Sequence, residues 1–64
     1  MNKLAMEMAI AFKKYMELEN ENGKAGNLEN AAYYMSKKWE TSKAAEENGV
    51  KEEFSAALKE LNIY

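Results

Sequence analysis

The sequence predicts an all-α fold, a small three-helix bundle with helices over residues 2–20, 28–48 and 50–61. Residues that lose little rotamer freedom in a helix are plentiful, above all Ala, Glu, Lys, Leu and Met, and Pro is absent from the chain. Apolar residues also recur at helical spacing in three stretches, which glycine- and asparagine-containing segments separate. These two observations favour helices over strands throughout the chain.

The first predicted helix has the widest apolar face. On a wheel of about 100° per residue, its apolar residues from Leu4 to Leu18 fall mostly on one half, and most of its lysines and glutamates fall on the other half. The segment 20–27, NENGKAGN, contains two glycines and three asparagines, which supply turn and cap conformations. We therefore expect this helix to contact both of the others and to end near residue 20.

The second predicted helix has a narrower apolar stripe, formed by Leu28, Ala31, Ala32, Met35 and Trp39. Asn27 is the expected N-cap, because its side chain can accept from the free amides of the next turn. Ser42 and Glu46 continue the same stripe. The sequence therefore leaves open whether this helix is continuous through residues 41–48.

The third predicted helix follows Gly49, which suits the left-handed position just past a helix end. Glu52 and Glu53 fall in its first turn, where carboxylates favour the positive end of the helix dipole. The three stripes together predict a core of Leu4, Met8, Ala11, Phe12, Tyr15, Met16, Leu28, Ala32, Met35, Trp39, Val50, Phe54, Leu58 and Leu61. Trp39 is the expected anchor of this core, because a large buried aromatic contributes more than any aliphatic residue.

The composition excludes most chemistry. With 64 residues we expect a single helical domain, residues 1–64. The chain contains no Cys, His, Arg or Asp, so neither a catalytic base beside a Ser or Thr nor a metal or cofactor site is expected. We also expect so thin a bundle to lack a pocket of a few hundred cubic ångströms. The sequence therefore predicts a protein that is not an enzyme.

The formal net charge of -2 arises from lysines and glutamates that are mixed along the chain. Glu7 interrupts the apolar run near the N-terminus, and no small-residue cleavage site follows it, so we expect a cytoplasmic location. No stretch approaches the roughly 20 apolar residues that span a bilayer. A membrane is therefore not an expected partner.

Two surfaces are candidate contact sites. If Met35 and Trp39 turn inward, the far side of the second helix carries an expected partner-binding set of Tyr33, Tyr34, Lys37, Lys38 and Thr41. Tyrosine is enriched where proteins bind one another. On the first helix, Met6 and Ile10 lie one turn apart within the charged half. They are the natural contacts if the chain forms a homodimer.

These features favour a small non-catalytic module that binds another protein. By analogy of size, it resembles the adaptors and small inhibitors that mobile elements encode. The alternative is a nucleic-acid-binding domain of the helix-turn-helix type, because a short glycine-containing turn joins the second and third helices. Glu52, Glu53 and Glu60 on the third helix and the absence of arginine disfavour this alternative.

Overall fold

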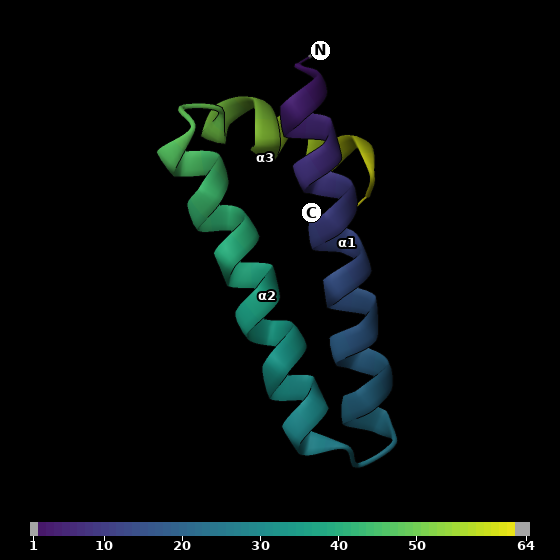
Figure 1. Ribbon diagram of the computed structural model, residues 1–64. Coiled ribbons are helices and arrows are strands. Elements are labelled where there is room, and N and C mark those ends of the chain that lie inside the picture. Colours follow the sequence, from purple (N-terminus) through teal and green to yellow (C-terminus); the bar gives the residue numbers. More distant parts are fainter. Residues whose placement is uncertain (1, 63–64) are drawn as a thin grey trace.

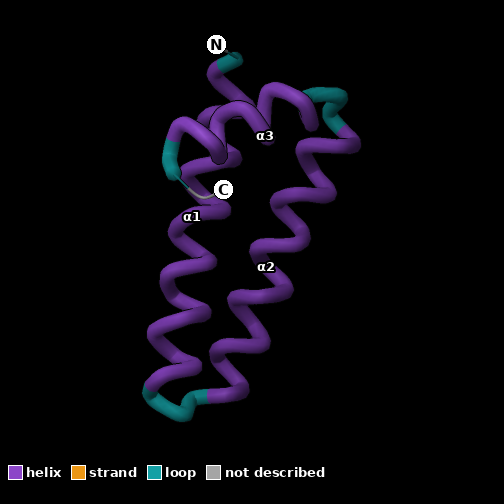
Figure 2. Tube along the Cα trace, turned by 180° about the vertical axis from the view of Figure 1, so that it is seen from behind, coloured by secondary structure: helices purple, strands orange, loops and turns teal. Residues whose placement is uncertain are grey.

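The computed structural model describes residues 2–62, which form the helices α1 (Lys3–Lys24), α2 (Leu28–Glu47) and α3 (Lys51–Glu60). α1 and α2 make a long antiparallel hairpin, and α3 crosses the end of the hairpin that carries the N-terminus (Figure 1). Seen from behind, α3 lies in front of the hairpin and leaves the loop end of α1 and α2 uncovered (Figure 2). The predicted three-helix, all-α architecture is confirmed.

Two glycines end the long helices in the same way. Gly26 and Gly49 have φ values of 82° and 70°. In both cases the next residue closes the six-residue hydrogen bond of a Schellman motif: Asn27 N–H donates to the Asn22 carbonyl at 2.8 Å, and Val50 N–H donates to the Ala45 carbonyl at 2.9 Å. The predicted role of Gly49 is therefore confirmed, and α2 is continuous through residues 41–48.

The first helix is longer than predicted. It continues four residues beyond residue 20, to Lys24. Asn22 does not break it, because its side-chain amide donates to the Leu18 carbonyl at 2.7 Å within the helix. Asn27 is the N-cap residue of α2 as predicted, but its side chain makes no cap hydrogen bond. At the start of α1, the side-chain oxygen of the N-cap residue Asn2 accepts from Ala5 N–H at 3.1 Å.

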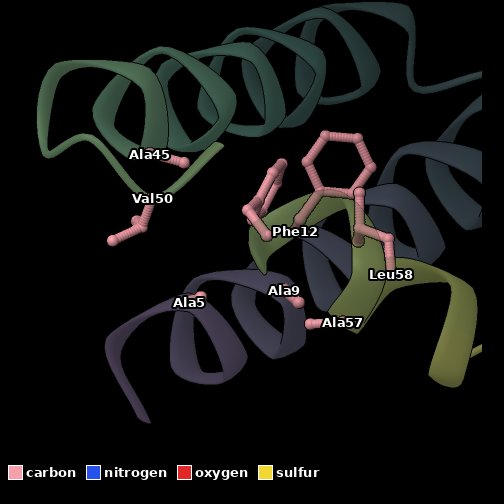
Figure 3. Close-up of a cluster of buried hydrophobic side chains, with 8 residues drawn as sticks. Ala5, Ala9, Phe12, Ala45, Val50, Ala57 and Leu58 are labelled. Carbon is pink, nitrogen blue, oxygen red and sulfur yellow. The ribbon is translucent and has the colours of Figure 1, made fainter. Parts of the chain in front are cut away.

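The buried core lies at one end of the molecule. Among residues 2–62, the buried side chains are Ala5, Ala9, Phe12, Ala45, Val50, Phe54, Ala57 and Leu58. They gather where α3 packs on α1 and on the last turns of α2 (Figure 3). Phe12 and Phe54 meet edge to face, with ring centroids 5.6 Å apart. No residue between 13 and 44 is buried.

The predicted core is right for parts of the chain and wrong for α2. Phe12, Val50, Phe54 and Leu58 are buried, and a second group is half-buried, namely Met8, Ala11, Tyr15, Met16 and Leu61. Leu4 is exposed at the edge of α1. On α2 the expected stripe is exposed except for Ala31, which is half-buried: Leu28 is 73% exposed, Met35 43% and Trp39 58%, and Ala32 is exposed as well.

α2 instead turns a different stripe toward α1, rotated by about 100° from the predicted one. Tyr34, Lys38, Thr41 and Ala45 carry this stripe and are half-buried or buried. The physical reason lies at the α3 end of α2. A helix that buried the predicted stripe would also turn Glu46 toward the core, where its charge would lose water. The observed rotation buries Ala45 and leaves Glu46 exposed, with its carboxylate 3.6 Å from the Lys51 ammonium.

Candidate interaction surfaces of the helical hairpin

An open groove of about 390 Å³ runs along the hairpin between α1 and α2, on the flank away from α3. Its lining residues are Leu4, Glu7, Met8, Ala11 and Tyr15 of α1 and Lys37, Glu40, Thr41 and Ala44 of α2. Five of these nine residues are apolar, and the small side chains of Ala11 and Ala44 leave room between the larger ones. The expectation that this bundle lacks a hollow of a few hundred cubic ångströms is wrong.

Aromatic rings continue the groove toward the loop end of the hairpin. The ring of Tyr15 stacks on that of Tyr34 with centroids 6.4 Å apart, and Tyr33 meets Tyr34 edge to face at 5.3 Å. The Lys37 ammonium lies 5.4 Å from the centroid of Tyr33 and 3.4 Å from the Glu40 carboxylate. Glu40, and then Tyr33, raise the pKa of Lys37 above its ordinary value. Lys37 therefore offers a positive charge beside the groove at neutral pH.

The structure divides the five predicted partner-binding residues between two sides of α2. Lys37 and Thr41 line the groove, and Tyr33 and Tyr34 lie beside it. Thr41 is half-buried, and its hydroxyl donates to the Lys37 carbonyl at 2.9 Å. The prediction that all five face outward together is wrong, because α2 is rotated.

Lys38 is the predicted partner-binding residue that does not lie at the groove. Its ammonium donates to the Glu19 carboxylate at 2.7 Å, and the two side chains are only 16% and 22% exposed. It also lies 5.9 Å from the ring centroid of Phe12 and 5.3 Å from that of Trp39. Lys38 therefore joins α1 to α2 and is committed to contacts within the chain.

The structure places Met6 and Ile10, the second predicted contact pair, in different environments. Met6 is half-buried and packs against the core cluster, so it is not the outward contact that the sequence suggested. Ile10 is 54% exposed, as expected. The prediction of a joint exposed pair is therefore wrong for Met6, because α3 packs on that flank of α1.

The largest apolar surface that the sequence did not identify is the Trp39 stripe, defined as Leu28, Ala32, Met35 and Trp39 of α2. Sequence reasoning placed it in the core. A signal against that placement was present, because the stripe loses its apolar character at Ser42 and Glu46, near the point where α3 must pack. Ala45, one position earlier than Glu46, is the residue whose stripe fits a core at that end.

Other kinds of site find no support in the part of the chain that the structure describes. Residues 2–62 contain no group of three or more acidic, His or Cys side chains that could hold a metal ion. Their buried side-chain nitrogen and oxygen atoms all have hydrogen-bond partners. None of the described helices is both long and apolar enough to cross a membrane.

Comparison with known proteins adds no assignment. No family model matches the sequence, and no curated protein or solved structure matches it significantly. The functional argument therefore depends on the two surfaces of the hairpin, the groove and the Trp39 stripe.

Proposed function

We propose that this chain is a small non-catalytic module that binds another protein by accepting an amphipathic helix of that protein in the groove between α1 and α2. The observation that carries the proposal is the groove itself, an open apolar channel with no occupant from residues 2–62. Adaptors and small inhibitors are the protein classes to which this activity belongs. A cytoplasmic location, expected from the sequence, remains part of the proposal.

The hairpin already binds one helix on its other flank, which supports this mode of recognition. α3 packs Phe54, Ala57 and Leu58 against Ala9 and Phe12 of α1. The groove has the same combination of side chains as that contact: large apolar residues lie next to small ones, which allow a helix to approach closely. Leu4, Met8, Ala11 and Tyr15 stand at intervals of four, three and four along α1, so that they form one continuous stripe against which the i, i+4, i+7 anchors of a bound helix can pack.

Charges at the groove serve orientation more than affinity. Glu7 lies on the α1 side, and the Lys37–Glu40 pair lies on the α2 side. Exposed pairs of this kind contribute little free energy, because water screens them. We expect apolar contacts to dominate binding, and Lys37 to select an acidic residue near the end of the partner helix that lies against Tyr33.

A comparison of two alanine substitutions tests the proposal. Ala11→Glu places a carboxylate in the lining of the groove, whereas Ala56→Glu makes the same change at an exposed position of α3. Each variant and the wild type would serve as bait in nuclease-treated lysate of the source cells, with mass spectrometry as the readout. We expect one stoichiometric protein on the wild type and on Ala56→Glu, and at least a tenfold loss on Ala11→Glu.

Circular dichroism melts of both variants ensure that the comparison concerns binding. Equal capture by a folded Ala11→Glu variant would exclude the groove as the binding site. Material recovered only when nuclease is omitted would instead favour the nucleic-acid alternative. In that case the wild type would capture no protein from nuclease-treated lysate, so Ala11→Glu would have no protein binding to reduce.

A further inference from the structure

We infer that the Trp39 stripe is the contact surface of a homodimer, in which α2 pairs antiparallel with α2 of a second copy of this chain. The inference is independent of the groove, because the two surfaces lie on different flanks of the hairpin. Three of the large hydrophobic side chains that residues 2–62 leave exposed belong to this stripe, namely Leu28, Met35 and Trp39. α3 crosses the end of the hairpin away from the loop between α1 and α2 (Figure 2), and all three side chains remain exposed.

The spacing of the stripe is that of a helix–helix seam. Its residues stand at positions 28, 32, 35 and 39, which alternate intervals of four, three and four. This alternation is the a/d pattern with which two helices interdigitate their side chains. The stripe extends over about 16 Å of helix. It therefore provides a short seam, suited to an association that depends on concentration.

An antiparallel register uses every residue of the seam. In such a pair, a positions of one helix face d positions of the other. Trp39 then lies against Leu28 of the second copy, and Ala32 lies against Met35 of the second copy. The two-fold axis repeats both contacts, so that four layers form. The small Ala32 leaves room for the long side chain of Met35, and no seam residue remains without a partner.

Charges along one edge of the stripe favour the same register. Glu29, Ser36 and Lys43 are spaced by seven residues and share that edge, and all three are exposed. In the antiparallel pair this edge faces itself, so Glu29 comes within reach of Lys43 of the second copy, and the axis repeats the pair. Side chains lean toward the N-terminus of their own helix, which moves these two groups toward each other.

A parallel pair is disfavoured by the same residues. It would bring the edge that carries Lys43 against the edge that carries Lys38 in the second copy, so that two lysines would meet. It would also place both copies of α3 at the same end of the pair. The antiparallel arrangement separates them to opposite ends and forms a closed, isologous dimer.

Sedimentation equilibrium and tryptophan fluorescence test the inference. The chain contains one tryptophan, and it lies in the seam. Between about 1 µM and 1 mM, a range that covers weak association, we expect the wild-type mass to rise toward twice that of one chain. The Trp39 emission should shift to shorter wavelength over the same range. Ala32→Glu should remain monomeric and show no shift, whereas Ala56→Glu should behave as the wild type.

Charge exchange tests the register. Glu29→Lys and Lys43→Glu should each raise the dissociation constant about five- to tenfold, and the double variant should restore it to within about twofold of the wild-type value. Ala32 is exposed, so its variant should melt as the wild type does at 1 µM. A wild type that is monomeric at 1 mM would overturn the inference. Association that survives Ala32→Glu, or a double variant that fails to restore it, would overturn the antiparallel seam.

Discussion

The two ends of the hairpin differ in what holds them together. At the α3 end, the buried side chains of three helices interdigitate, and helices approach closely over Ala5, Ala9, Ala45 and Ala57. At the loop end, α1 and α2 meet through the stacked rings of Tyr15 and Tyr34 and through the Lys38–Glu19 pair, and no side chain is buried. The comparison indicates that stability is concentrated at the α3 end, whereas the groove and the Trp39 stripe lie on the hairpin outside the buried cluster.

The same substitution at the two ends should give the largest contrast. Leu58 is 1% exposed and Leu28 is 73% exposed. Leu58→Ala should lower the free energy of unfolding by about 2 to 5 kcal/mol, which approaches the whole stability expected of so small a core. Leu28→Ala should lower it by about 0.5 kcal/mol or less. Urea titrations followed by circular dichroism at low protein concentration measure both, and equal losses would contradict the uneven core.

The ion pair that joins the helices at the loop end should have an intermediate effect. Glu19→Gln preserves the shape of the side chain but removes its charge, and the pair is mostly shielded from water. We expect the free energy of unfolding to fall by about 1 kcal/mol. A double-mutant cycle with Lys38→Met isolates the pair. A coupling energy near zero would show that the aliphatic part of the Lys38 side chain, and not its charge, makes the stabilising contact.

Trp39→Ala should have a small effect on stability, comparable to that of Leu28→Ala. The sequence predicted it as the anchor of the core, with an expected cost of about 3 to 5 kcal/mol. Because the side chain is 58% exposed, we now expect about 0.5 kcal/mol for the monomer. Thermal melts at micromolar concentration provide the measurement. A loss above 2 kcal/mol would show that the predicted stripe faces inward after all.

The sequence was sufficient for the helices and for the α3 end of the core. Gly49 marked the end of α2, and the periodicity of Phe12, Phe54 and Leu58 identified the faces that meet, whereas α1 ends at Lys24, four residues beyond the predicted end. It was not sufficient for the rotation of α2. That rotation turns Lys38 toward α1, and a lysine is not expected to face another helix until Glu19, nineteen positions earlier, is placed opposite its ammonium.

The wrong orientation of α2 also explains why the candidate contact residues were predicted to share one face. Because Trp39 was expected inside, the tyrosines and lysines beside it were expected to share one outward face. Turning α2 by about 100° sends Lys37 and Thr41 to the groove and Lys38 to the interior contact, and it brings Trp39 into solvent. Single-helix periodicity compares the polarity of stripes, whereas the position of α3 decides which stripe is covered.

The concentration of buried side chains at the α3 end also determines how the hairpin moves. We expect backbone amides near Ala9 and Phe12 to exchange with solvent mainly when the whole domain unfolds, whereas amides beside the loop 25–27 should exchange through local fraying of the helix ends. We therefore expect the loop ends of α1 and α2 to separate more readily than the ends that α3 covers. If the groove accepts a helix as proposed, its tyrosine end is the part that should widen to fit a thicker one, because no buried side chain holds the two helices together there.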